Sequence, residues 1–204
     1  MRQALIVYAK RPLPGRAKTR LGAAIGHAAA AGVYARLLYA YLFDLLEANL
    51  GDTRVVLSVA APEDVAFFAE AFPELTVRAQ VAGDLGQRMA ASFEWVFAAG
   101  AEQAVLTGSD VPGLGSETVN AAFVALKQAP LVIGPAADGG YYLLGMRAPG
   151  VDLFTGVAWS TEDVLDQTTV LAATHGLDVV YLPQRADLDT EADWVRWRAG
   201  VIGG

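Results

Sequence analysis

A single carboxylate follows a short apolar run in the middle of the chain. Residues 104–106 lead through Thr107-Gly108-Ser109 to Asp110, and Pro112 stops a regular backbone beyond it. A carboxylate at the carboxyl end of a strand in an open α/β sheet lies where such sheets bind ligands. It is also the hard oxygen ligand that Mg²⁺ takes when it carries substrate phosphates. Asp110 is therefore a candidate metal ligand, and the alternative is a residue that only caps the following turn.

A basic loop lies near the start of the chain, between positions 10 and 20. It contains Lys10, Arg11, Arg16, Lys18 and Arg20, five of the fifteen lysines and arginines. Cations beside backbone N–H groups at a helix start can bind polyphosphate. The loop is not a Walker loop, because Pro12 and Ala17 stand where that motif needs its glycines. We predict a polyphosphate site, and the alternative is a basic loop that only contacts solvent.

Further carboxylates lie in two later segments. Asp138 precedes two glycines that let the backbone approach a ligand, although Asp-Gly is also a strong hairpin-turn dipeptide. Asp189-Thr190 is typical of a helix N-cap, but capping does not account for Asp187 two residues upstream. Because Asp110 and Asp189 both follow strands expected in one parallel sheet, they can converge on one divalent ion. Whether Asp187 joins them stays open.

Composition narrows the classes of function. The chain has no cysteine, which excludes disulfides, thiolate zinc sites and cysteine nucleophiles and is compatible with a cytosol. Its net charge of −7 argues against a surface for nucleic acid or anionic membrane. Both histidines, His27 and His175, lie at expected helix ends, so we do not expect a histidine-centred hydrolase.

The first apolar run is too short for a secretory signal, and no cleavage site follows it. The long apolar segment 28–50 carries Arg36, Asp44 and Glu47, which argues against a membrane span. We therefore expect a cytoplasmic protein.

The elements that must position these residues alternate between strand and helix patterns. Strands are predicted at 4–9, 55–59, 75–81, just before Asp110, and at 131–134, 141–146 and 179–182. Helices are predicted at 27–49, from Pro62 onward, and at 86–99, 116–128, 160–175 and 190–198. This alternation favours a three-layer α/β/α sandwich with a mostly parallel central sheet, formed by one domain over residues 1–204.

The motifs together resemble those of the nucleotide-diphospho-sugar transferase superfamily, which has the GT-A fold. They are most similar to a glycosyltransferase-like bacterial group related to 2-phospho-L-lactate guanylyltransferase. That group carries an A-K-x-P-x-x-G-x-x-K-T-R-L segment, matched here by Ala9, Lys10, Pro12, Gly15, Lys18, Thr19, Arg20 and Leu21. Further matches are 83–89, Gly108–Pro112, Asp138–Tyr142, Trp159–Thr161 and Asp187–Thr190. The resemblance covers essentially the whole chain.

The resemblance also implies roles for individual residues. It implies a nucleotide site formed by Lys10, Gly15, Arg16, Lys18, Arg20, Gly83, Leu85 and Gly86. It implies that Asp110 and Asp189 hold Mg²⁺ or Mn²⁺. The acceptor or sugar then faces Asp138, Gly139, Gly140 and Trp159, and the catalytic residues are Lys18, Arg20, Asp110 and Asp138.

One departure from the sugar-transferring members of this fold guides the choice of reaction. Those enzymes usually carry Asp-x-Asp, whereas position 108 is glycine here and only Asp110 is acidic, as in nucleotidyltransferases. Attack on an α-phosphorus needs charge neutralisation and in-line positioning more than an acid–base residue. We expect Mg²⁺-dependent nucleotidyl transfer from a nucleoside triphosphate to a small phosphorylated acceptor. The alternatives are a glycosyltransferase using a nucleoside-diphosphate sugar and a nucleotide-binding protein without turnover. The base, the acceptor and any oligomeric state stay open.

Overall fold

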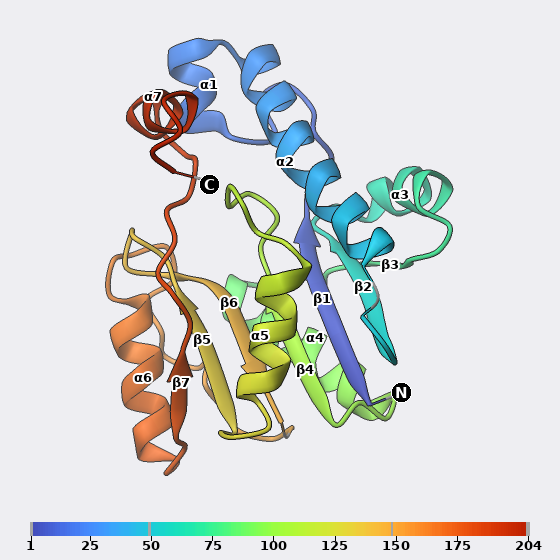
Figure 1. The fold of residues 1–204 in the computed structure, drawn as a ribbon, viewed down its shortest axis with the longest axis vertical. Helices are drawn as coiled ribbons and strands as arrows, with labels where there is room; N and C mark the ends of the chain where they lie inside the picture. Colours follow the sequence, from blue (N-terminus) through green and yellow to red (C-terminus); the bar gives the residue numbers. More distant parts are fainter. Residues whose placement is uncertain (1, 49, 148, 203–204) are drawn as a thin grey trace.

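The computed structural model describes residues 2–48, 50–147 and 149–202, which form one mixed sheet covered by helices (Figure 1). The strands are β1 (Gln3–Ala9), β2 (Thr53–Val59), β3 (Thr76–Ala79), β4 (Gln103–Thr107), β5 (Leu131–Pro135), β6 (Tyr141–Met146) and β7 (Val179–Tyr181). Their order across the sheet is β3-β2-β1-β4-β6-β5-β7. Strand β6 runs antiparallel to β4 and β5, and the other pairs run parallel. The predicted mostly parallel sheet is confirmed.

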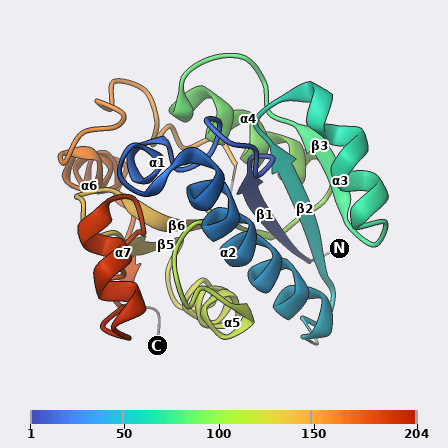
Figure 2. The same cartoon turned by 90° about the horizontal axis from the view of Figure 1, so that it is seen from above.

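Helices cover both faces of this sheet (Figure 2). They are α1 (Thr19–Ile25), α2 (His27–Glu47), α3 (Val65–Ala71), α4 (Leu85–Ala98), α5 (Ser116–Ala125), α6 (Val164–Thr174) and α7 (Glu191–Arg198), with a short 3₁₀ turn η1 (Pro62–Asp64). Helices α2 and α5 lie on one face, and α4 and α6 lie on the other (Figures 1 and 2). This arrangement is the predicted three-layer α/β/α sandwich.

Strand β1 shows why the sheet needs two covering layers. Its Leu5 and Val7 pack into the core beneath α2 and α5, whereas Ala4 and Ile6 pack into the core beneath α4. All four side chains are almost completely buried. The sequence of a strand that is buried on both faces is a continuous apolar run, because neither set of alternating side chains contacts water. The run 4–9 therefore predicted the position of β1 correctly.

Two helix boundaries differ from the prediction for backbone reasons. The basic loop leads into α1, an additional helix that Gly26, with φ of 91°, separates from α2. Helix α6 begins at Val164 rather than at Ser160, because Ser160 has a positive φ of 68°. The predicted end of the first helix at Asn49 lies outside the described residues.

Helix α2 is long and apolar enough to cross a membrane by length and composition, but half of its most apolar window is buried inside the molecule. Tyr34, Leu38 and Leu42 of this helix belong to the core that covers β1. Length and composition are weak evidence for a membrane span in a helix packed in this way.

Candidate functional site

A cavity of about 550 Å³ lies at the carboxyl ends of the neighbouring parallel strands β1 and β4. The segment after β1 contributes Lys10, Lys18 and Arg20 to its lining. The segment after β4 contributes Asp110, and Asp189 enters from the segment before α7. Ligands of open α/β sheets bind at this edge, and the volume suits a small-molecule ligand.

A chain of hydrogen bonds fixes the segment after β4 against the segment after β1. The Ser109 hydroxyl donates to the carbonyl of Tyr8 at 2.8 Å, so the Tyr34 hydroxyl must donate to Ser109 at 2.9 Å. The backbone N–H of Lys10 in turn donates to the Tyr34 hydroxyl at 2.9 Å. Burial raises the pKa of Tyr34 to about 12, so this phenol stays protonated and able to donate. The side chain of Asp110 is thereby held at the cavity.

Gly108 leaves room for the carboxylate of Asp110. A Cβ atom at position 108 would lie 3.1 Å from Asp110 Oδ1, which is tighter than an ordinary contact. The glycine at this position, noted in the sequence, thus allows Asp110 to keep its present conformation.

The ammonium of Lys18 lies between the two predicted metal ligands. Its Nζ donates to Asp110 Oδ2 at 2.9 Å and to Asp189 Oδ1 at 2.6 Å. The Lys18 side chain is only 3% exposed, whereas those of Asp110 and Asp189 are 40% and 39% exposed. Burial by itself would lower the pKa of Lys18, but the two carboxylates outweigh it and the pKa is raised.

Lys18 reaches this position from an unusual backbone conformation. It is the N-cap residue of α1, with φ of 49° and ψ of 48°, and its side chain makes no capping bond. A non-glycine residue in the left-handed region costs about 1 kcal/mol. Within the described residues, Ser160 is the other non-glycine residue with positive φ, and it lines the same cavity. Two strained residues at one cavity make this cavity the candidate functional site.

Asp187 adds a third carboxylate to this region. Its Oδ1 atom is buried and has no hydrogen-bond partner among the described residues. Burial, together with the nearby charges of Asp110 and Asp138, raises the pKa of Asp187 to about 7. A buried carboxylate oxygen without a donor is suited to a cation.

The raised pKa of Asp187 makes a prediction about stability. Without metal, the folded state keeps this proton between about pH 4 and pH 7 while the unfolded chain releases it. The contribution of Asp187 to the free energy of unfolding therefore falls across this window and then levels off. The Asp187→Asn variant lacks this contribution. Chemical denaturation in EDTA should therefore show that the free energy of unfolding of the variant rises relative to that of wild type as the pH rises to 7. A constant difference between the two proteins from pH 4 to 8 would contradict the assignment.

The oxygen donors present here fit a hard divalent ion in chemical type. Asp110 and Asp189 bracket one cation, and Asp187 offers an unpartnered oxygen beside them. The described residues nevertheless contain no group of three His, Cys, Asp or Glu side chains already arranged to hold a metal. Mg²⁺ or Mn²⁺ held by these three carboxylates would therefore require Lys18 to leave its present position.

Asp138 lies in the turn between β5 and β6. Its Oδ1 accepts a hydrogen bond from the N–H of Gly140 at 3.0 Å, and the N–H of Ala136 donates to the carbonyl of Gly140. The hairpin alternative therefore describes the local structure of this motif. The charge of Asp138 still acts on Asp187, which places the turn beside the carboxylates.

Two of the five cations of the basic loop point to other partners. Arg16 donates to Glu63 at 2.8 Å, and Arg11 lies 3.8 Å from the buried Asp64 and over the ring of Phe67. Arg16 and its neighbour Gly15 do not line the cavity. Lys10 and Arg20 do, and their side chains make no ion pair or hydrogen bond with the described residues. Of the five cations of the basic loop, these two are free to meet an anionic ligand.

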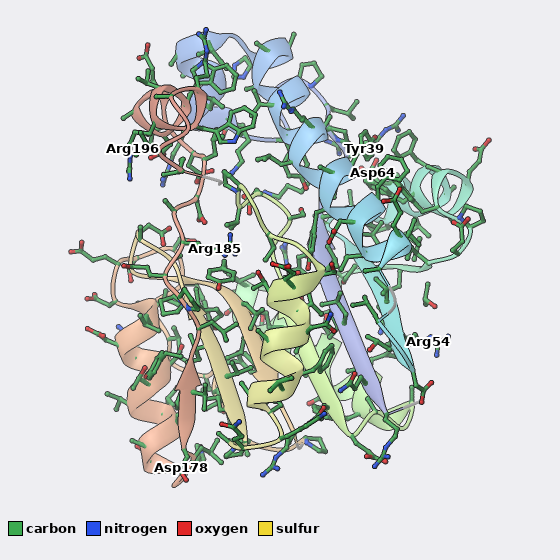
Figure 3. The ribbon with its side chains drawn as sticks, in the orientation of Figure 1. Tyr39, Arg54, Asp64, Asp178, Arg185 and Arg196 are labelled. Carbon is green, nitrogen blue, oxygen red and sulfur yellow. The ribbon has the colours of Figure 1, made fainter. Side chains whose placement is uncertain are left out.

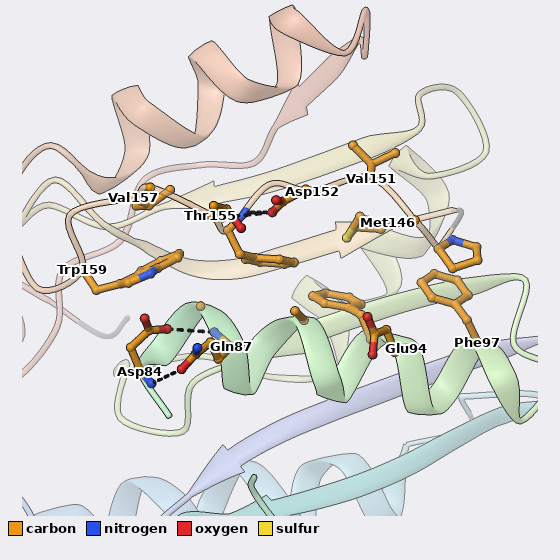
Figure 4. Close-up of a pocket in the computed structure, with 17 residues that line it drawn as sticks. Asp84, Gln87, Glu94, Phe97, Met146, Val151, Asp152, Thr155, Val157 and Trp159 are labelled. Atoms are coloured by element: carbon orange, nitrogen blue, oxygen red, sulfur yellow. Dashed lines mark hydrogen bonds between the residues drawn. The ribbon is translucent and has the colours of Figure 1, made fainter. Parts of the chain in front are cut away.

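The predicted residues Gly86 and Trp159 lie at a second cavity, of about 480 Å³, between α4 and the segment 149–159 (Figure 4). A Cβ atom on Gly86 would come within 2.6 Å of Trp159 Nε1, so only glycine lets the indole pack against the first turn of α4. Asp84 caps this helix through a capping box with Gln87. Within the described part of the chain no lysine or arginine lines this cavity, so it offers no cation to a phosphate.

Other residues of the Gly83–Met89 motif either bond to one another or line the first cavity. Gly83 accepts a hydrogen bond from Arg88 Nε at 2.9 Å, whereas Leu85 and Arg88 line the first cavity. Sequence reasoning missed Arg88 and Gln80 as lining residues. Arg88 lies about one helical turn after Leu85, so the helical spacing could have indicated it. Gln80 follows β3 without any motif that distinguishes it.

Comparison with known proteins identifies the family. Residues 42–161 match the family described as "Uncharacterized protein conserved in bacteria (DUF2064)". The structure matches a "putative nucleotide-diphospho-sugar transferase" from Desulfovibrio desulfuricans G20 with a TM-score of 0.89 and 32% identity, over 97% of this chain and 87% of that chain. The chain belongs to this bacterial family, within the nucleotide-diphospho-sugar transferase superfamily. No curated protein matches the sequence.

More distant solved structures share the fold alone. CMP:2-keto-3-deoxy-manno-octonic acid synthetase, in complex with CTP, matches with a TM-score of 0.58 and 14% identity, over 98% of both chains. The mannosyltransferase PcManGT from Pyrobaculum calidifontis, in complex with GDP-Man and Mn²⁺, matches with a TM-score of 0.54 and 15% identity, over 97% of this chain and 59% of that chain. Members of this fold thus include nucleotidyl and sugar transferases.

Proposed function

We propose that this protein transfers a nucleotidyl group from a nucleoside triphosphate to a small phosphorylated acceptor, with Mg²⁺ or Mn²⁺, in the cavity at the ends of β1 and β4. The observation that carries the proposal is the convergence of Asp110 and Asp189 on a single cation, beside the free cations Lys10 and Arg20. Carboxylates for a metal and cations for phosphate oxygens are the two groups that attack on phosphorus requires.

The reaction balances without an acid–base residue. An ionised phosphate oxygen of the acceptor attacks the α-phosphorus and forms the new P–O bond, while the bond from the α-phosphorus to the bridging oxygen breaks. Pyrophosphate leaves with that electron pair, and no proton has to be moved. This is consistent with a cavity that no histidine lines within the described residues.

The charge of each residue in the cavity determines its proposed role. Lys10 and Arg20 would bind the β- and γ-phosphates, and Lys18 would join them once released from its carboxylates. Asp110, Asp187 and Asp189 would hold the metal, which when bound supplies charge neutralisation at the α-phosphate. Leu85, an exposed apolar side chain in the lining, would pack against the nucleoside.

Sugar transfer is the second candidate, because the mannosyltransferase that shares this fold binds GDP-Man and Mn²⁺. The same carboxylates would then hold the metal, and the same cations would bind the diphosphate leaving group. The lone Asp110 after β4, together with Lys10, Lys18 and Arg20 in the cavity lining, favours the larger charge of a triphosphate.

Parallel product assays separate the two reactions. The purified full chain should release pyrophosphate from one nucleoside triphosphate when Mg²⁺ and a panel of small phosphorylated acids and alcohols are supplied. The matched reactions contain nucleoside-diphosphate sugars and are assayed for nucleoside diphosphate, with EDTA as the metal-free control. Release of nucleoside diphosphate from a sugar donor, with no pyrophosphate from any triphosphate, would replace the proposal by sugar transfer.

A further inference from the structure

The position of Lys18 determines when a metal can enter the site. Its ammonium contacts Asp110 Oδ2 and Asp189 Oδ1 at 2.9 and 2.6 Å and is almost completely buried, so it occupies the cation position between these two oxygens. A divalent ion needs oxygen atoms of the same two carboxylates. Lys18 and the metal therefore cannot both occupy this position.

We propose that Lys18 is a built-in cation that keeps the metal site closed until a polyphosphate draws the side chain away. Metal and nucleotide then bind together, and the metal alone binds weakly. The inference rests on the proposed function only in assuming that the cavity receives a metal and a polyphosphate.

The backbone of Lys18 supports such a movement. The residue is in the left-handed region at the start of α1. A lysine gains by leaving this conformation. The N–H of Gly22 holds its carbonyl at 2.8 Å, and the two ion pairs hold its side chain. Lys10 and Arg20 line the same cavity as Lys18, so a polyphosphate bound by these two cations would lie within the cavity that Lys18 also lines.

The charges around the site make the movement depend on phosphate. Without a ligand, withdrawal of Lys18 would leave Asp110 and Asp189 beside Asp187, whose Oδ1 already lacks a hydrogen-bond donor. A metal that enters alone must therefore first displace two short ion pairs. When a polyphosphate is present, Lys18 exchanges carboxylate partners for phosphate oxygens and the metal takes its place. Each ligand thus favours the other, and the coupling is reciprocal.

Binding of Mn²⁺ in the absence of nucleotide tests this inference on the full chain. The free-ion signal in electron paramagnetic resonance gives the dissociation constant directly. Lys18→Met removes the ammonium at similar side-chain length and should bind Mn²⁺ at least about tenfold more tightly than wild type, within the usual range of coupling between sites. Lys18→Gly, which suits the left-handed backbone, should show the same gain even if the methionine variant folds poorly.

Arg20→Met is the matched control, because Arg20 lines the same cavity without contacting the carboxylates. It measures how much the loss of any nearby positive charge improves metal binding, and its effect should be much smaller. The double variant Lys18→Met, Asp110→Asn should lose the gain, which places the bound ion at this site. Equal affinities of wild type and Lys18→Met, or equal gains in Lys18→Met and Arg20→Met, would overturn the inference.

The outcome is distinguishable from failure of the proposed function. A wild-type protein that shows no pyrophosphate release, but whose Lys18 variants gain Mn²⁺ affinity, would keep the inference and remove the nucleotidyl-transfer proposal. Pyrophosphate release without any gain in the Lys18 variants would do the reverse.

Discussion

Asp110→Asn should reduce Mg²⁺-dependent pyrophosphate release by about 100-fold or more while leaving the fold intact. The amide keeps the shape of the side chain but loses the charge that neutralises the metal, and loss of one such electrostatic contact typically costs this much in rate. The change also removes one ion pair of Lys18, but Asp189 retains the second at 2.6 Å. Calorimetric titration of the Mg²⁺-nucleotide complex measures the loss of binding, and circular dichroism checks the fold.

Asp189→Asn should act in the same direction. Thr190, not Asp189, caps helix α7, so loss of a cap cannot account for an effect at Asp189. Asp178→Asn is the control, because this exposed carboxylate lies at the end of the molecule opposite α1 and α7 (Figure 3). If Asp110→Asn binds the Mg²⁺-nucleotide complex as tightly as wild type, Asp110 is only a turn residue.

Gly139→Ala should destabilise the protein by about 3 kcal/mol and abolish activity together with the fold of the site. Gly139 has φ of 89°, and a Cβ atom there would collide with the backbone of Glu162 just before α6. Backbone atoms cannot move aside as a flexible side chain can. The N–H of Leu165 also donates to the carbonyl of Gly139 at 2.9 Å, so the collision would disturb the contact between the β5–β6 turn and α6. Thermal unfolding and pyrophosphate release measure the two effects.

Gly140→Ala is the matched control for this prediction. The Cβ atom at position 140 would meet only Asp138 Oδ1, at 3.3 Å, and this side chain can adjust. Gly140→Ala should therefore unfold within a few degrees of wild type. Similar losses of thermal stability in both variants would show that the turn tolerates no added side chain at either position, rather than a specific collision at Gly139.

The sequence determined much of the fold because its signals are local. The apolar runs at 4–9 and 131–134 and the alternation of strands with helices predicted β1, β5 and the layered sandwich. Exceptions arose where the conformation of one residue decided a boundary. Gly26 divides α1 from α2, and Ser160, with its positive φ, delays the start of α6. Neither conformation follows from residue type alone, because many glycines and serines lie inside helices or loops without ending them.

The sequence also determined which residue types the site would need, and it indicated that Asp110 and Asp189 could converge. Only the tertiary structure decided the partners of the basic side chains. Lys18 contacts carboxylates 92 and 171 residues away along the chain, and Arg16 turns to Glu63 instead of the cavity. Such pairings depend on how packed elements orient long, flexible side chains. Spacing along the sequence carries no information about that orientation. The sequence could therefore assign these cations to a phosphate site, but it could not reveal that Lys18 occupies the position proposed for the metal.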